Sequence, residues 1–251
     1  MRVFLLVACL IFTQVLNAET LFEGYSQILL QKAPVGYVVQ RFRFDAKKKR
    51  FESVYYIRTG PQAGNMSESL QAYANDKFEP ISYRYTETKK DFFRSIDATF
   101  EKGVMKLDMN TKGNKSSSQV KLPKGAFLST FLGYLMLSKG LTTGKKFGYQ
   151  AIAEEDGKVY RGQAYIKTKE KVGTLDAFRV LNKYKNSNFI SHMTEKAEVL
   201  STVSPVRQIS TLLVKAPHLA LKSLPLPPKT LKLLFGNIPK GKKNILNVKA
   251  K

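Results

Sequence analysis

The sequence predicts a mainly β protein: a curved antiparallel sheet, or half-barrel, capped by one apolar helix and followed by a basic, proline-rich C-terminal extension. Between Gly24 and Val214, apolar and polar residues alternate in segments of strand length that are separated by short turns. Residues 125–140 instead repeat their apolar residues at helical spacing. The apolar fraction of 43 %, with 11 % aromatic residues, is enough for a buried core and excludes a wholly disordered chain.

Residues 1–18 have the pattern of a secretory signal peptide. An arginine provides the positive start, residues 3–12 form an unbroken apolar run, and the small residue Ala18 stands where a signal peptidase cleaves. We therefore expect cleavage after Ala18 and a mature protein that is periplasmic or secreted. A short lipobox ends at Cys9, so a lipoprotein anchored there is the alternative, although the greasy residues that follow Cys9 favour cleavage after Ala18.

The strand pattern is clear in residues 36–44. Phe42 and Phe44 fall on one face of this segment, and Arg41 and Arg43 fall on the other. Such alternation is typical of a sheet with one solvent-exposed face. Further strands are expected at residues 51–59, 66–74, 81–86, 92–100, 105–109, 147–153, 159–167, 175–184 and 189–200. Their even spacing and short turns favour an antiparallel sheet over a βαβ array.

Three shorter segments complete this part of the chain. Residues 113–118 are polar and are expected to form a loop tip. Asp156 and Gly157 are a strong hairpin signal, because glycine accepts a positive φ. Residues 207–214 fit either a last strand or a helical turn.

One apolar helix is expected before the second group of strands. Phe127, Phe131, Tyr134 and Leu135 recur at helical spacing, and Gly140 is a natural stop. A helix with so much apolar surface must be covered. Two interpretations stay open: the helix fills the hollow of the sheet as core, or part of its surface lines a cavity for a lipid or acyl chain.

The C-terminal extension, residues 215–251, differs from the half-barrel domain expected over residues 19–214. Five prolines preclude long regular elements, while many leucines keep the segment apolar. From Val199 to the end the chain has ten Lys or Arg residues and no acid. A short amphipathic helix is expected at residues 229–235.

Motifs for catalysis, metals and cofactors are missing from the sequence. With one Cys and two separated His, the chain has little material for a zinc site, and it has no nucleophile elbow and no dinucleotide fingerprint. Residues 140–146 resemble a phosphate loop only superficially. His192 could act as a general base, but a single strand histidine is more often a packing residue. We expect no enzyme, no catalytic residue, no bound metal and no cofactor.

The net charge is the strongest indication of function in the sequence. A formal net charge of +23 attracts polyanions, among them nucleic acid, anionic lipid and lipopolysaccharide. Export disfavours nucleic acid and favours an anionic membrane surface. The residues expected to bind that surface are Lys229, Lys232, Lys240, Lys242 and Lys243. A basic but merely solvated surface is the alternative.

The strands between Leu21 and Val214, the helix of residues 127–137 and the return strand of residues 149–157 resemble periplasmic half-barrel proteins of bacterial envelopes. The resemblance is to the lipoprotein-localisation carriers and neighbouring uncharacterised domain families. In the carriers, a curved sheet closed by helices shields acyl chains in an apolar cavity. The resemblance therefore implies a cavity for a lipid or lipoprotein acyl chain, although the basic extension departs from the carrier pattern.

These observations lead to one expected function and one alternative. The expected function is a non-catalytic envelope protein that binds a lipid-like or other amphiphilic ligand in an apolar cavity and is steered to anionic membrane. The alternative is a structural or interaction protein whose C-terminal extension docks on an envelope partner. The expected cavity-lining residues are Phe42, Phe44, Tyr83, Tyr85, Phe127, Phe131, Tyr134 and Leu135.

Overall fold

A computed structural model of the protein describes residues 18–248. Fifteen strands form one curved, open sheet, which confirms the predicted mainly β class. The strands are β1 (Glu19–Leu30), β2 (Ala33–Asp45), β3 (Arg50–Thr59), β4 (Ser67–Asn75), β5 (Pro80–Lys89), β6 (Phe92–Glu101), β7 (Val104–Thr111), β8 (Asn114–Lys121), β9 (Phe127–Leu128), β10 (Lys146–Ala153), β11 (Lys158–Val172), β12 (Leu175–Tyr184), β13 (Ser187–Met193), β14 (Val199–Ser204) and β15 (Ile209–Val214). The helices are η1 (Pro61–Ala63), η2 (Ser129–Phe131), α1 (Leu132–Ser138), α2 (Pro217–Leu221), α3 (Pro228–Phe235) and η3 (Ile245–Asn247).

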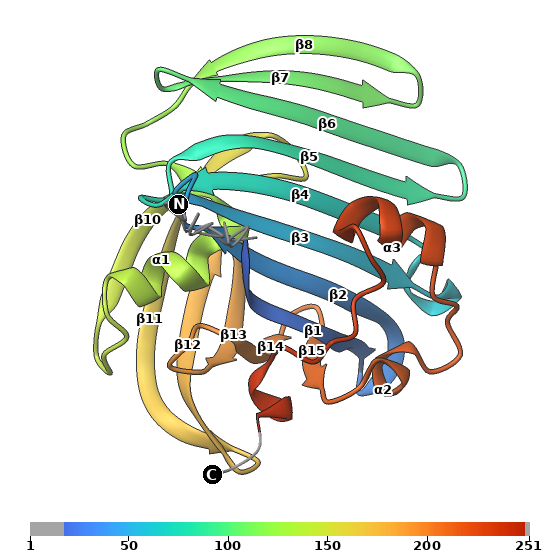
Figure 1. Ribbon diagram of the computed structural model, residues 1–251, viewed down its shortest axis with the longest axis vertical. Helices are drawn as coiled ribbons and strands as arrows, with labels where there is room; N and C mark the ends of the chain where they lie inside the picture. Colours follow the sequence, from blue (N-terminus) through green and yellow to red (C-terminus); the bar gives the residue numbers. More distant parts are fainter. Residues whose placement is uncertain (1–17, 249–251) are drawn as a thin grey trace, which may run out of the picture.

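The sheet is two meanders joined at their first and last strands. Its order is β8-β7-β6-β5-β4-β3-β2-β1-β15-β14-β13-β12-β11-β10-β9, so β1 pairs with β15 although nearly the whole chain lies between them. Figure 1 shows that β2–β8 and β10–β13 run in different directions, as expected for a sheet that twists and bends along its length. This bend surrounds the space into which α1 fits.

The inner face of the sheet, defined here as the face that α1 packs against, carries the larger core. On β2 this face holds Phe42, whose ring lies 4.9 Å from that of Tyr134 on α1. Phe131, just before α1, is fully buried in the same core. The helix therefore caps the curved sheet, as the sequence predicts.

The predicted limits of two segments are wrong. The α-helix begins at Leu132, five residues after the expected start at Phe127, because β9 pairs in parallel with β10 and η2 intervenes. This parallel pair is an exception to the expected antiparallel pattern. Residues 113–118 are not a loop tip, since all but the first belong to β8 and pair with β7. Of residues 207–214, expected as a last strand or a helical turn, Ile209–Val214 form the last strand, β15, and the first two residues belong to the turn before it.

The outer face of β1–β3 is covered by the C-terminal segment, residues 215–248. Leu231 and Phe235 of α3 pack with Tyr37 and Val39 of β2 in a second core. The expectation that this face of β2 is exposed to solvent is wrong at Arg41, whose side chain is only 3 % exposed. The amphipathic helix expected at residues 229–235 is confirmed as α3, with its apolar side against the sheet.

A buried ion pair attaches the C-terminal segment to the sheet. Arg41 contacts Glu23 of β1 at 2.6 Å and also donates to the Phe235 carbonyl. Glu23 Oε1 in turn accepts hydrogen bonds from the backbone N–H groups of Lys240 and Gly241 at 2.7 Å each. These bonds fix where the segment crosses the sheet.

Within residues 18–248, none of the helices combines the length and the hydropathy needed to cross a membrane. The predicted signal peptide, apart from Ala18, lies outside the described residues, as does Cys9.

Candidate ligand-binding site

A large cavity, of about 840 Å³, lies between the two meanders, away from the β1–β15 pair that joins them. One wall is the β4–β5 turn, and the opposite wall is formed by β10, β11 and the β12–β13 turn. The chain entering β9 and the helix α1 contribute the rest. Its lining residues are Lys77, Phe78, Glu79, Lys124, Gly125, Ala126, Phe127, Leu135, Lys139, Gly148, Tyr149, Gln150, Arg161, Gly162, Gln163, Lys183, Tyr184, Lys185 and Asn186.

Aromatic rings and glycines form the apolar part of this lining. Tyr149 of β10 and Tyr184 of β12 flank Gly162 of β11, and their ring centroids are 6.0 Å apart. A Cβ atom on Gly162 would come within 2.3 Å of the Tyr149 ring, so only glycine lets this ring lie flat on the sheet. Phe127 packs edge-on against Tyr149. The result is an aromatic surface of mutually tilted rings against which an apolar group can rest.

Positive charge dominates the rest of the lining. Five of its cationic residues form no ion pair within residues 18–248: Lys77, Lys124, Lys139, Arg161 and Lys183. The one acid in the lining, Glu79, accepts a hydrogen bond from Asn75 at 2.6 Å. A cavity with this charge and an aromatic surface suits a molecule that is both apolar and anionic.

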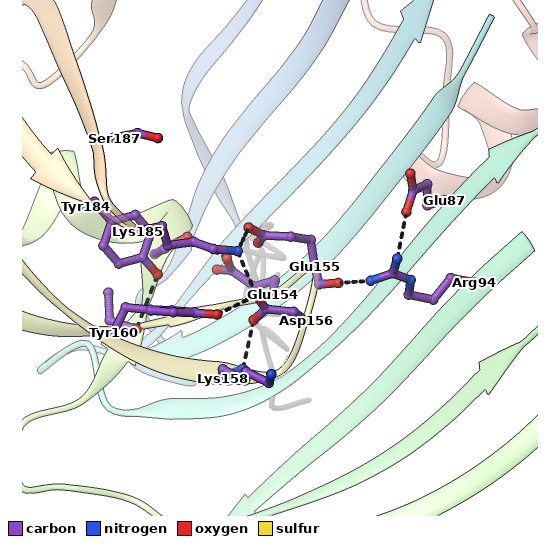
Figure 2. Close-up of polar contacts among 12 residues, drawn as sticks. Glu87, Arg94, Glu154, Glu155, Asp156, Lys158, Tyr160, Tyr184, Lys185 and Ser187 are labelled. Carbon is purple, nitrogen blue, oxygen red and sulfur yellow. Dashed lines mark hydrogen bonds and ion pairs between the residues drawn. The ribbon is translucent and has the colours of Figure 1, made fainter. Parts of the chain in front are cut away.

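A polar cluster at the β10–β11 turn holds the walls of the cavity together (Figure 2). Lys185 Nζ lies 2.6 Å from Glu155 and 2.7 Å from Asp156. Burial lowers the pKa of Lys185, but its bonds to these carboxylates prevail and raise it. Arg94 of β6 donates to the Glu155 carbonyl at 2.9 Å and pairs with Glu87 of β5. The cluster therefore links strands of both meanders.

Glu154 attaches the helical insert to the same turn. Its carboxylate accepts hydrogen bonds from the Ser129 hydroxyl at 2.5 Å and from the Thr130 N–H at 3.0 Å. Burial raises the pKa of Glu154 to about 7, and these two hydrogen bonds only partly oppose that shift. Ser53 of β3 adds a hydrogen bond to the Thr130 hydroxyl. The segment leading into α1 is thus fixed from two strands.

Two five-residue turns, residues 75–79 and residues 194–198, have the same pattern of hydrogen bonds and contribute to the linings of the two inner cavities. In one, the Asn75 side chain accepts the N–H groups of Lys77 and Glu79. In the other, residues 194–198, Thr194 Oγ1 accepts the N–H groups of the corresponding residues at 3.2 Å. The fourth residue of each turn has a left-handed backbone: φ is +64° at Phe78 and +63° at Ala197. Each turn therefore directs the side chain of its fourth residue, Phe78 or Ala197, towards the core.

The expected cavity residues are divided between several places. Phe127 and Leu135 line the large cavity, while Phe42 and Tyr134 line a smaller one of about 240 Å³. Phe131 is fully buried in the core, as is Tyr85, which is 1 % exposed.

Two further expected residues lie away from the large cavity. Tyr83 is buried and borders another cavity, of about 330 Å³. The ring of Phe44 lies 4.6 Å from that of Phe51. Ligand binding by all eight residues stays a prediction.

The lysines expected to bind an anionic surface are all exposed, and they lie on the C-terminal segment. Lys229 and Lys232 belong to α3. Lys240, Lys242 and Lys243 line an open hollow of about 470 Å³ beside the start of β1. None of them lines the large cavity, so the structure separates two cationic surfaces where the sequence suggests one.

His192 lies in a row of polar side chains across β11–β14. Its Nδ1 is 2.8 Å from Ser201 Oγ, and its Nε2 is 2.8 Å from a Glu170 carboxylate oxygen. These groups have the types of a hydrolytic triad, yet none of them lines the cavities of about 840, 240, 330 and 470 Å³. We interpret the row as cross-strand pairing on the sheet surface.

Sequence reasoning missed several residues of the large cavity. The strand glycines Gly148 and Gly162 carry a signal, because glycine inside a strand marks the close approach of another group. Phe78 gives no such signal in the sequence, because a bulky residue is not expected to adopt the left-handed backbone that places its ring at the cavity. The five cations that have no ion pair within residues 18–248 come from four separate parts of the chain, so only the fold brings them together.

Comparison with known proteins shows a likeness at the level of the fold. Neither a protein-family model nor a curated protein matches the chain. The solved structure of a β-barrel-like protein of the domain of unknown function DUF1849 from Brucella abortus aligns with a TM-score of 0.55 and 11 % identity, over 78 % of this chain and 97 % of that chain. A DUF1089 family protein from Pseudomonas aeruginosa aligns with a TM-score of 0.39 and 12 % identity, over 68 % and 90 %. The resemblance to lipoprotein carriers stays a prediction, and the first alignment shows that this chain has a β-barrel-like fold.

Proposed function

We propose that the protein binds a lipid-like, anionic amphiphile in the large cavity without catalysis, and that it acts in the bacterial envelope after removal of residues 1–18. The observation that carries this proposal is the combination, around one cavity of about 840 Å³, of an aromatic surface with five cations that have no ion pair within residues 18–248. The apolar part of the ligand rests against Phe127, Leu135 and Tyr149. Its acidic group is bound by residues such as Arg161 and Lys183.

The C-terminal lysines have a different role in this proposal. Lys229 and Lys232 lie four residues and one residue before Leu233 on α3, and Leu233 is 83 % exposed. An exposed leucine beside lysines suits the surface of an anionic membrane, where the apolar side chain inserts and the ammonium groups bind phosphates. These residues steer the protein to the membrane, and the cavity binds one molecule. The alternative of docking on an envelope partner is limited to the same exposed side, since the other side of α3 is packed on the sheet.

The cavity is tested by filling it. Gly148 belongs to the cavity lining, and a Cβ atom there would have no other atom within 4 Å, so Gly148→Trp is chosen to add a large ring at the cavity wall. We expect the mature chain to bind lysophosphatidylglycerol in native mass spectrometry and in titration, and this variant to lose at least tenfold in affinity. Ser116→Trp, on the exposed strand β8, is the matched control and keeps wild-type affinity. A wild-type protein that binds no amphiphile, or a Gly148→Trp protein that binds as wild type, contradicts the proposal.

The two cationic surfaces are tested by crossed variants. Arg161→Gln with Lys183→Gln lowers the affinity for lysophosphatidylglycerol monomers and leaves sedimentation with phosphatidylglycerol vesicles unchanged. Lys229→Gln with Lys232→Gln leaves the affinity for lysophosphatidylglycerol monomers unchanged and lowers sedimentation with phosphatidylglycerol vesicles. Equal effects of both pairs on both measurements would show that only the total charge matters.

A further inference from the structure

A second cavity, of about 240 Å³, lies on the inner face of β1 and β2. Phe42 and Tyr134 belong to its lining, together with parts of β14 and β15 and the turn at Ala197. The large cavity also touches α1, but at Leu135. Adjacent residues of one helix therefore line two different cavities.

A row of aromatic rings separates the two cavities. Phe78, in the lining of the large cavity, stacks on Phe51 with ring centroids 4.8 Å apart and an interplanar angle of 16°. Phe51 lies 6.0 Å from Tyr134, and Tyr134 lies 4.9 Å from Phe42. Phe131 supports the row from within the core. We define Phe78, Phe51, Tyr134 and Phe42 as the aromatic partition.

The end of the partition at the large cavity is held in place against a conformational preference. Phe78 has φ +64°, a left-handed value that is costly for a bulky side chain. The surrounding turn imposes it, because the Phe78 N–H donates to the Asn75 carbonyl and the Asn75 side chain accepts from both neighbours of Phe78. The ring is only 5 % exposed, so its position is determined by packing as well as by the turn.

We propose that the aromatic partition determines the length of the chain that the protein accepts, and that the small cavity becomes a second binding site for the end of an acyl chain when the partition is opened. This inference rests on the proposed function. At roughly 30 Å³ per non-hydrogen atom, the large cavity holds about 28 atoms, which suits one acyl chain with its head group and not two. The small cavity adds room for about eight.

The experiment measures affinity across a series of saturated lysophosphatidylglycerols, from about 10 to about 20 carbons. Tyr134→Ala and Phe78→Ala open the partition, so we expect the preferred chain to lengthen by roughly four to eight carbons, the capacity of the small cavity. Tyr134→Leu and Phe78→Leu retain more packing and are measured in the same way if an alanine variant does not fold, as judged by circular dichroism. They are expected to lengthen the preferred chain by less.

Two controls separate the partition from general effects of losing a ring. Tyr134→Phe keeps the ring and keeps the wild-type chain preference. Phe100→Leu removes a ring beside Tyr83, outside the partition, and also leaves the preference unchanged. A folded alanine or leucine variant of Tyr134 or Phe78 with unchanged chain preference overturns this inference alone, whereas a wild-type protein that binds no chain overturns the proposed function.

Discussion

The outer and inner faces of the central strands β1–β3 differ in how they are covered. On the outer face, the chain covers its own sheet with α2, α3 and a buried ion pair whose acceptors and donors are matched. On the inner face, α1 covers only part of the surface, and cavities remain on both sides of the aromatic partition. The packed core under α3 on the outer face provides stability, and the cavities on the inner face leave room for a ligand.

The carboxylates that attach the covering segments to the two faces differ in whether they have a cationic partner. Glu23, on the outer face, has Arg41 as a buried cationic partner. Glu154, which holds the insert on the inner face, has hydrogen bonds but no ion pair within the described part of the chain. The outer attachment is therefore expected to be the stronger one, and the inner attachment is expected to depend on pH.

The largest effect is expected from breaking the outer attachment. Arg41→Met leaves the buried carboxylate of Glu23 without its cation and should lower the free energy of unfolding by about 3–5 kcal/mol. Urea denaturation measures this. Adding Glu23→Gln removes the unpaired charge and should restore part of the loss. Arg84→Met breaks an exposed pair with Asp97 and should cost about 0–1 kcal/mol, so an equal loss in both would contradict the proposed difference.

The inner attachment should show itself as a pH dependence. The pKa of Glu154 is higher in the folded protein, about 7, than its ordinary value of 4.5, so the folded state favours the proton. Stability from this group is complete below about pH 4.5 and is lost as the pH rises through about 7, by about 3 kcal/mol at most.

Glu154→Gln should flatten this slope, since the amide can still bond to Ser129 and Thr130. Urea midpoints measured between about pH 5 and about pH 8 test the expectation. Glu68, whose pKa burial also raises to about 7, provides a remaining slope of the same sign. A Glu154→Gln profile parallel to that of wild type would show that Glu154 does not titrate in this range. Glu101→Gln, at an exposed carboxylate, is the control.

A smaller effect on stability is expected from substituting the glycines that line the large cavity. Gly162→Ala brings a methyl group against the Tyr149 ring and should cost about 1–3 kcal/mol. Gly148→Ala, in the adjacent strand, meets no other atom within 4 Å and should not destabilise the protein. Tyr149→Leu should rescue Gly162→Ala in a double-mutant cycle. Thermal unfolding measures the wild type and the four variants, and additive losses of Gly162→Ala and Tyr149→Leu would show that the ring and the glycine do not interact.

The smallest effect is expected at a polar row that neither cavity uses. His192→Ala removes bonds to Ser201 and Glu170 on the sheet surface and should lower Tm by about 2 °C or less. Lysophosphatidylglycerol affinity should not change, because His192 does not line the large cavity. Loss of binding with an unchanged Tm would instead assign a functional role to this row.

The sequence predicts the fold class because most of the strands show their alternation locally, with β8 and β9 as exceptions. It predicts less where long-range pairing decides. Phe127 and Leu128 look helical by spacing, yet their pairing with Ala151 and Ile152 of β10 makes them a strand. Arg41 looks exposed by alternation, and only its distant partner Phe235 and the rest of the C-terminal segment bury it.

The candidate site is predictable only in part for the same reason. Phe127 and Leu135 are identified by apolar spacing and do line the large cavity. The cations that surround it, such as Lys77 and Arg161, look like ordinary surface residues in the sequence, because the position of the β4–β5 turn opposite β11 is a property of the folded sheet.

The pair of matching turns at Asn75 and Thr194 bears on how the two cavities are lined. Each presents its fourth residue beside a different cavity, with a phenyl ring at Phe78 and a methyl group at Ala197. The hydrogen bonds of both turns are made by the backbone and by the side chain of the first residue. The side chain of the fourth residue takes no part in them and can be changed without breaking them. Exchanging that one residue would change the lining of one cavity while the hydrogen bonds of the turn stay in place.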